Sequence, residues 1–134
     1  MTTRGDGYSG TDVSEGWNEI VKILLESGVD AYKVDNDGCT PLYIASQKGY
    51  LKVVKYLVEE CKAEVDKARE TGESSLYVAT QEGRFEVLKF LVEVGNAHVN
   101  KRDNRGSTPL FIAKFYLTNV SEDVVKYLKG KGAK

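Results

Sequence analysis

Few residues in this chain have the types and spacing that catalysis or metal binding requires. His98 is the only histidine, and no Ser-His-Asp or Cys-His set can be completed around it. Cys39 and Cys61 fit neither a metal-ligand spacing nor a disulfide framework. The glycine-flanked segments 5–7 and 130–132 are too short for phosphate-binding loops. The sequence therefore predicts a protein that is not an enzyme and has no cofactor or metal site; specific nucleotide binding in a calorimeter would contradict this.

A stretch that combines acids, a cysteine and a glycine is the best remaining candidate for chemistry, but the chain repeats it. The stretch occupies residues 35–45 (DNDGCTPLYIA), returns at 103–113 (DNRGSTPLFIA), and has a less regular copy at 69–79 (RETGESSLYVA). Its glycines lie at positions 38, 72 and 106, a constant period of 34 residues. A fixed period of this size is typical of stacked supersecondary units. The repeated residues are therefore interpreted as structural, and the variable ones as free for recognition.

Two kinds of helix are predicted in each unit. A short one starts at a capping Thr or Ser, with proline at the first helical position in two copies, and the first two copies end at Gly49 and Gly83. A longer one follows, with paired apolar residues one turn apart, as in Val53, Val54, Leu57 and Val58. The last copy has three extra residues between its helices, near positions 115–119.

Composition limits the setting and the class of partner. The 134 residues are 41% hydrophobic and 29% charged, with a net charge of −1 and a pI near 5.9. This charge argues against a nucleic-acid partner, which usually requires a clearly basic face. No apolar run reaches the roughly 18 residues of a membrane span, and the N-terminus has no hydrophobic signal core. The sequence predicts an intracellular protein, cytoplasmic or nuclear, without direct membrane insertion.

With its Asp-x-x-Gly-x-Thr-Pro-Leu-Tyr-x-Ala frame, the following Gly and Val-Val-x-x-Leu, and a closing Val-Asp or Val-Asn, the chain resembles the ankyrin-repeat family over residues 16–134. Tetratricopeptide repeats share the period but lack the turn and the Thr-Pro-Leu cap. The resemblance implies an all-α solenoid of stacked helix-turn-helix units with β-turn or hairpin tips. About four repeats are expected in a single domain, 1–134: a poorly ordered or degenerate segment 1–15, a partial repeat 16–34, repeats 35–68 and 69–102, and a C-terminal repeat 103–134.

The resemblance also implies a function. Such a protein is expected to be a monomer that binds a protein or peptide through its tips and the concave face formed by its first helices. The alternative is a segment of a larger adaptor or scaffold whose catalytic or membrane-linked function lies elsewhere. Removing the repeated frame leaves these candidate partner-binding residues: Asn36, Asp37, Cys39, Gln47, Lys48, Glu70, Thr71, Glu73, Gln81, Glu82, Asn104, Arg105, Ser107, Phe115 and Tyr116.

One departure from the family pattern bears on the turns. The usual histidine after Thr-Pro-Leu is replaced by Tyr43, Tyr77 and Phe111. A tyrosine can keep a hydrogen bond at this place and a phenylalanine cannot. The sequence therefore predicts that the hydrogen-bond network near Phe111 differs from that of the other two copies.

Overall fold

The computed structural model describes residues 32–115 and 122–134. Within these ranges the chain forms helices only, in the order α2 (Pro41–Lys48), α3 (Leu51–Glu59), α4 (Ser75–Gln81), α5 (Phe85–Glu93), α6 (Pro109–Phe115) and α7 (Glu122–Gly130). The fold is an all-α repeat solenoid, as predicted. The predicted segment 1–15 and most of the partial repeat 16–34 lie outside the described residues, so these two divisions remain predictions.

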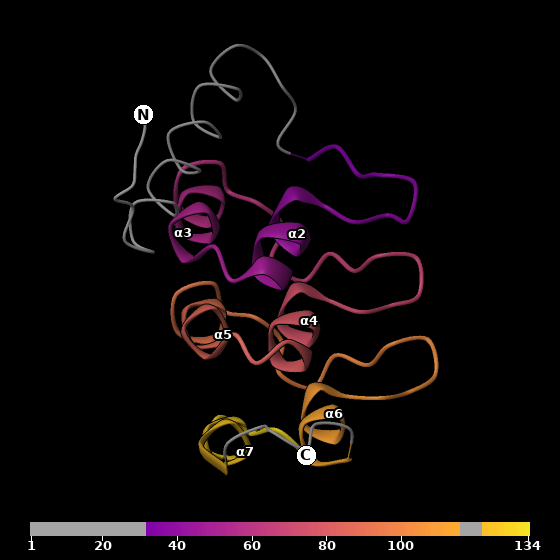
Figure 1. The fold of residues 1–134 in the computed structure, drawn as a ribbon, viewed down its shortest axis with the longest axis vertical. Coiled ribbons are helices and arrows are strands. Elements are labelled where there is room, and N and C mark those ends of the chain that lie inside the picture. Colours follow the sequence, from indigo (N-terminus) through magenta and orange to yellow (C-terminus); the bar gives the residue numbers. More distant parts are fainter. Residues whose placement is uncertain (1–31, 116–121) are drawn as a thin grey trace, which may run out of the picture.

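The helices form two parallel rows (Figure 1). The short helices α2, α4 and α6 make one row, with α2 against α4 and α4 against α6. The longer helices α3, α5 and α7 make the other row, and each packs against the short helix of its own pair. The turn that precedes each short helix projects from the side of the α2–α4–α6 row that faces away from the second row.

The short helices begin as the sequence predicts. The side chains of Thr40, Ser74 and Thr108 each accept a hydrogen bond from the backbone N–H three residues later, at 3.0, 3.1 and 3.1 Å. These caps satisfy one of the otherwise unpaired N–H groups at each helix start. At the other end, Gly49 caps α2 with φ of 77°, and Gly83 has φ of 72° just beyond α4. Such positive φ angles favour glycine.

A continuous apolar core lies between the two rows. Its most buried members are leucines and valines from both rows, among them Leu42, Val54, Leu76, Leu88 and Leu128, all at most 1% exposed. Each fully buried side chain of this kind contributes about 1.5–3 kcal/mol through removal of apolar surface from water. Since each unit uses its apolar residues against its neighbours, specific recognition falls to the polar positions that remain.

The loop that closes each of the first two units turns at a non-glycine residue with positive φ. Lys62 has φ of 55° and Asn96 has φ of 56°. Both residues lie in the loop between a long helix and the next turn, at places 34 residues apart, so the two loops share this left-handed geometry.

Candidate protein-interaction surface

The tips carry most of the predicted partner-binding residues, and the majority of these are exposed. Asn36 and Asp37 lie on the first tip, Glu70 and Thr71 on the second, and Asn104 and Arg105 on the third. Each tip is tightened by a backbone hydrogen bond from its glycine, 2.8–3.0 Å to the carbonyl three residues earlier. The tips thus present polar side chains on rigid turns.

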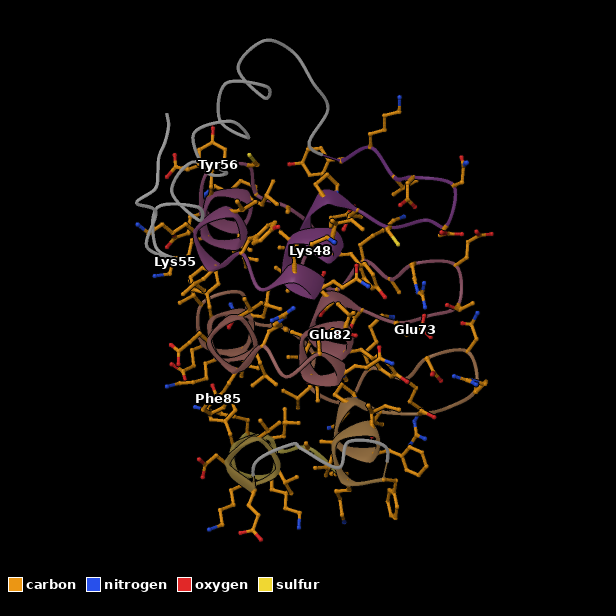
Figure 2. All side chains as sticks on the ribbon, viewed as in Figure 1. Lys48, Lys55, Tyr56, Glu73, Glu82 and Phe85 are labelled. Atoms are coloured by element: carbon orange, nitrogen blue, oxygen red, sulfur yellow. The ribbon has the colours of Figure 1, made fainter. Side chains whose placement is uncertain are left out.

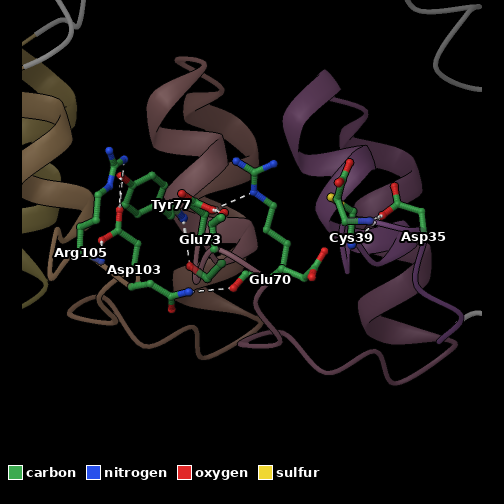
Figure 3. Close-up of polar contacts among 12 residues, drawn as sticks. Asp35, Cys39, Glu70, Glu73, Tyr77, Asp103 and Arg105 are labelled. Carbon is green, nitrogen blue, oxygen red and sulfur yellow. Dashed lines mark hydrogen bonds and ion pairs between the residues drawn. The ribbon is translucent and has the colours of Figure 1, made fainter.

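The three tips are joined by backbone hydrogen bonds. Glu70 N donates to Asp37 O at 2.9 Å, and Asn104 N donates to Thr71 O at 3.0 Å. Asn104 Nδ2 also donates to Glu70 O at 2.8 Å, a contact drawn in Figure 3. Asn104 is therefore exposed but already engaged within the protein, which reduces its freedom to contact a partner.

Two of the predicted partner-binding residues are buried, so these two predictions are wrong. Cys39 is 7% exposed and packs with Tyr43 and Val78 between the first two units. Burial raises the pKa of its thiol. Cys39 contacts Val78 of α4, in the next unit, and does not point toward solvent. The variation of this position among the three turns did not indicate that direction.

Glu73 is 6% exposed, and it is buried because the middle turn uses a different ion pattern. Its carboxylate accepts hydrogen bonds from Arg69 Nε at 2.7 Å and from the Thr71 hydroxyl. Arg69 occupies the place that Asp35 and Asp103 occupy in the other turns, and in this turn Arg69 donates to the carboxylate of Glu73. Burial alone would raise the pKa of Glu73, but the hydrogen bonds from Thr71 and Arg69 outweigh it and the pKa is lowered.

In the outer turns an aspartate accepts from backbone N–H groups of its own turn (Figure 3). Asp35 Oδ1 accepts from the backbone N–H groups of Asp37 and Cys39, both at 2.9 Å. Asp103 Oδ1 accepts from those of Arg105 and Ser107 at the same distance. The bond from the Cys39 N–H is the main cause that lowers the pKa of Asp35. For Asp103, burial raises the pKa, but the backbone bonds and the Tyr77 hydroxyl outweigh it and lower the pKa.

The tyrosines link each unit to the next turn. Tyr77 donates its hydroxyl proton to Asp103 Oδ2 at 3.0 Å, and burial together with this bond raises the pKa of Tyr77. Tyr43 is also buried, with the Arg69 guanidinium 5.5 Å from its ring centre. Burial raises the pKa of Tyr43 to about 12.

At the equivalent place, Phe111 is 39% exposed, and its ring centre lies 4.9 Å from that of Phe115. Phe111 has no hydroxyl to donate, and its ring contacts a second ring of the same helix, α6.

The first helices carry the rest of the predicted surface. Lys48, Gln81 and Glu82 are exposed, whereas Gln47 and the tip residue Ser107 are half-buried. Figure 2 shows Lys48 on α2 and Glu82 on α4 in neighbouring places of the same row. Phe115, at the end of α6, is 66% exposed. Tyr116 lies outside the described residues, so its prediction stays open.

The residues first considered for chemistry have structural contacts. His98 is exposed; its backbone N–H donates to Asp66 Oδ1 at 2.9 Å, and its Nδ1 accepts from Asn100 N at 3.2 Å. Within residues 32–115 and 122–134, no three His, Cys, Asp or Glu side chains gather in a way that could hold a metal ion. None of the helices in these ranges is long and apolar enough to cross a membrane.

Four residues around the last turn and α6 are exposed but are not among the predicted partner-binding residues: Arg102, Phe111, Lys114 and Lys134. Arg102, Phe111 and Lys134 line an open hollow of ≈ 390 Å³ together with tip residues of the last unit.

Comparison with known proteins agrees with this architecture. The family model described as ankyrin repeats (3 copies) matches residues 13–69 and 59–134. Protein phosphatase 1 regulatory subunit 27 of Mus musculus is 38% identical over 61 residues, which cover 46% of this chain and 39% of that protein. A putative ankyrin repeat protein of Fowlpox virus (strain NVSL) is 39% identical over 46 residues, 34% of this chain and 33% of its own.

The potassium channel GORK of Arabidopsis thaliana is 36% identical over 59 residues, 44% of this chain but only 7% of the channel. The matches thus span about two fifths or less of each relative. The family model, by contrast, covers nearly the whole chain, and it agrees with the paired helices, the capped short helices and the projecting turns described above. The chain belongs to the ankyrin-repeat family.

Proposed function

We propose that this chain is a non-catalytic binding module that captures a partner protein or peptide through its tips and the exposed residues of α2, α4 and α6. Ankyrin repeats generally mediate protein–protein interaction. One observation carries the proposal for this chain: the residues that repeat are used in turns, caps and core, whereas most of those that vary are exposed along one side. An intracellular monomer would be consistent with this role.

The charge on this surface changes along the stack. The first two tips present Asp37 and Glu70, whereas the third presents Arg105, whose side chain is 81% exposed. A partner that binds across all three tips would therefore carry basic groups toward the first two units and acidic groups toward the last. Complementary charges of this kind act mainly on specificity and on association rate.

The test compares two charge-reversed baits with wild type in quantitative affinity capture. Asp37→Lys combined with Glu70→Lys changes the tips, and Glu59→Lys makes the same kind of change on α3, in the opposite row. Proteins retained by wild type and by Glu59→Lys but lost from the tip variant would support the proposal. Glu73 is left unchanged because it is buried. An identical set of captured proteins for all three baits, at unchanged melting temperatures, would overturn it.

A second candidate is that the chain serves as a segment of a larger adaptor or scaffold. The match to a regulatory subunit of protein phosphatase 1 favours an adaptor role, and the match to 7% of a potassium channel shows similar repeats as a small part of a longer protein. Mass spectrometry of the native protein would test this candidate: a mature chain of 14.9 kDa would contradict it.

A further inference from the structure

The tips present three equivalent side chains at a regular spacing. Asp37, Thr71 and Arg105 occupy the same place in consecutive turns, 34 residues apart in the sequence, and all three are exposed. We call these three residues the tip column. In Figure 1 the tips project from the row of short helices, on the side away from the long helices. The tip column is therefore accessible to another protein without movement of the helices.

The exposure of the tip column is a property of its place in the turn. Asp37 O accepts from Glu70 N at 2.9 Å and Thr71 O accepts from Asn104 N at 3.0 Å, so the first two tips each have a following tip against them. Asp37 and Thr71 are exposed in spite of this contact. The following tip thus binds the backbone at this place and leaves the side chain in solvent. Arg105 occupies the same place, and its side chain is 81% exposed.

Hydrogen bonds hold the tip column in a fixed arrangement. Asp37 N donates to Asp35 Oδ1 and Arg105 N donates to Asp103 Oδ1, both at 2.9 Å. Backbone bonds of nearly equal length join the first tip to the second and the second tip to the third. The three side chains are therefore preorganised, which reduces the entropy lost on association.

The tip column has opposite charges at its two ends and no charge in the middle. Asp37 carries a negative charge, Thr71 is neutral and Arg105 carries a positive charge. Within residues 32–115 and 122–134, the Asp37 side chain makes no hydrogen bond or ion pair. Arg105 Nη2 lies 3.9 Å from Asp103 Oδ2, at the limit of an ion pair. Both charged ends are therefore available for stronger pairs.

A column with this order of charges is complementary to itself when one copy is rotated by half a turn about an axis through the middle tip. Asp37 of one copy then faces Arg105 of the second copy, and Arg105 of the first faces Asp37 of the second. Thr71 lies on the axis in both copies. A two-fold axis always relates contacts in this reciprocal way. We propose that two copies of this chain associate antiparallel through their tip columns, held by two Asp37–Arg105 ion pairs.

The same charges disfavour the other simple pairings of two tip columns. A parallel pair would place Asp37 against Asp37 and Arg105 against Arg105, and like charges across an interface suppress association. An antiparallel pair shifted by one tip would place the charged residues against Thr71, so no opposite charges would meet. The order of charges therefore selects one register.

Glu70 opposes the association, because it lies beside Thr71 and meets its own equivalent across the axis. The antiparallel pair thus has two attractive contacts and one repulsive contact. Exposed ion pairs contribute little each, and small interfaces are typical of weak, transient complexes. The association is therefore weak, and the chain is a monomer in dilute solution.

The association goes beyond the proposed function and does not depend on it, because it requires only the charges and the spacing of the tips. It covers residues that the proposed function assigns to a partner protein. Self-association and partner capture are therefore mutually exclusive at the tips, and a rising concentration of the chain would reduce capture.

The experiment measures the apparent mass of the full chain by sedimentation equilibrium at concentrations up to about 0.5 mM. The apparent mass of wild type should rise above 14.9 kDa with concentration. Asp37→Arg makes both ends of the tip column positive, and Arg105→Asp makes both ends negative. Each variant alone should self-associate at least about tenfold more weakly than wild type. An equimolar mixture of the two should associate again, because both pairs are then opposite in charge.

A second mixture controls for net charge. Glu59→Arg in α3 and Lys126→Asp in α7 change net charge in the same way, but on the row of long helices. This mixture should associate no more strongly than wild type. Glu70→Gln removes the repulsive contact and should strengthen self-association about twofold or more. Raising ionic strength from about 0.1 to about 1 M should weaken wild-type association, because the Debye length falls from about 10 to about 3 Å.

Three outcomes would overturn the inference. These are a wild type that stays at the monomer mass up to about 0.5 mM, single tip variants that associate as wild type does at equal melting temperature, and a tip-variant mixture that associates no better than the control mixture. Affinity capture tests the proposed function separately. If wild type stays monomeric but the Asp37→Lys and Glu70→Lys bait loses captured proteins, the inference fails and the proposed function stands.

Discussion

Tyr77 and Phe111 hold the same place in consecutive repeats but have opposite environments. Tyr77 is 2% exposed and donates a hydrogen bond to the turn of the following unit, whereas Phe111 is 39% exposed and contacts Phe115. Both lie just after a capped helix start with the same geometry, so local structure does not distinguish them. The difference lies in the neighbouring unit that packs over Tyr77, so the burial of a repeated residue depends on the unit that follows it.

The largest effect is expected in the core of the interior joint. Leu76→Ala removes a side chain that is 1% exposed and leaves a cavity, which typically costs about 2–5 kcal/mol. Phe115→Ala, at an exposed position at the end of α6, should change the free energy of unfolding by less than about 0.5 kcal/mol. Urea unfolding followed by circular dichroism measures both. Similar losses for the two variants would show that Phe115 is as tightly packed as Leu76.

The middle turn should be the next most sensitive. Glu73→Ala leaves Arg69 and the Thr71 hydroxyl without their shared acceptor, at an expected cost of about 1–3 kcal/mol. The equivalent change in the last turn, Ser107→Ala, should be nearly neutral, because Asp103 holds that turn through its own carboxylate. Thermal unfolding of the two variants gives the comparison, and equal changes would argue against a distinct role for Glu73.

Tyr77→Phe should cost about 0.5–1.5 kcal/mol at neutral pH, since it removes the hydrogen bond to Asp103. The reciprocal change, Phe111→Tyr, should have little effect.

The pKa of Asp103 is lowered in the native protein. The contribution of Asp103 to stability is therefore complete above the ordinary aspartate pKa near 4, and it is lost as pH falls through the lowered pKa. The destabilisation by Tyr77→Phe should therefore shrink below about pH 4. The measurement is the difference in unfolding free energy between wild type and variant from about pH 7 to about pH 3. A constant difference over this range would contradict the role of the ionised Asp103.

The smallest effect concerns the middle repeat's missing proline. Ser75 stands where the flanking repeats have Pro41 and Pro109, and its buried hydroxyl has no hydrogen-bond partner among the described residues. Ser74 is already extended, with φ of −86° and ψ of 172°, which suits a residue before proline. Ser75→Pro should stabilise the protein by about 0.4–1 kcal/mol. A lower melting temperature would show that the Ser75 N–H or hydroxyl has a role in the native protein.

Much of the fold could be predicted from the sequence because its signals are local and repeated. The 34-residue period, the Thr-Pro caps and the glycine positions each specify geometry within a few residues, and the structure confirms the helices they predict. The candidate surface was harder, since exposure depends on the neighbouring unit. The place of Glu73 is occupied by different residues in the three copies, as expected for a partner-binding position. In the structure, however, its carboxylate accepts a hydrogen bond from Arg69. Phe111 belongs to the repeated frame, yet it is 39% exposed, whereas Tyr43 and Tyr77 at the equivalent places are buried.

The two buried tyrosines have a consequence for how such a chain can lengthen by tandem duplication. Tyr43 meets an arginine in the following turn, and Tyr77, at the same place, meets an aspartate. One side chain therefore accommodates either charge, through its ring or through its hydroxyl. A duplicated copy of residues 69–102 would set Tyr77 against a second Arg69, a pairing that Tyr43 already makes. At this contact, an internal duplication of residues 69–102 would need no compensating substitution.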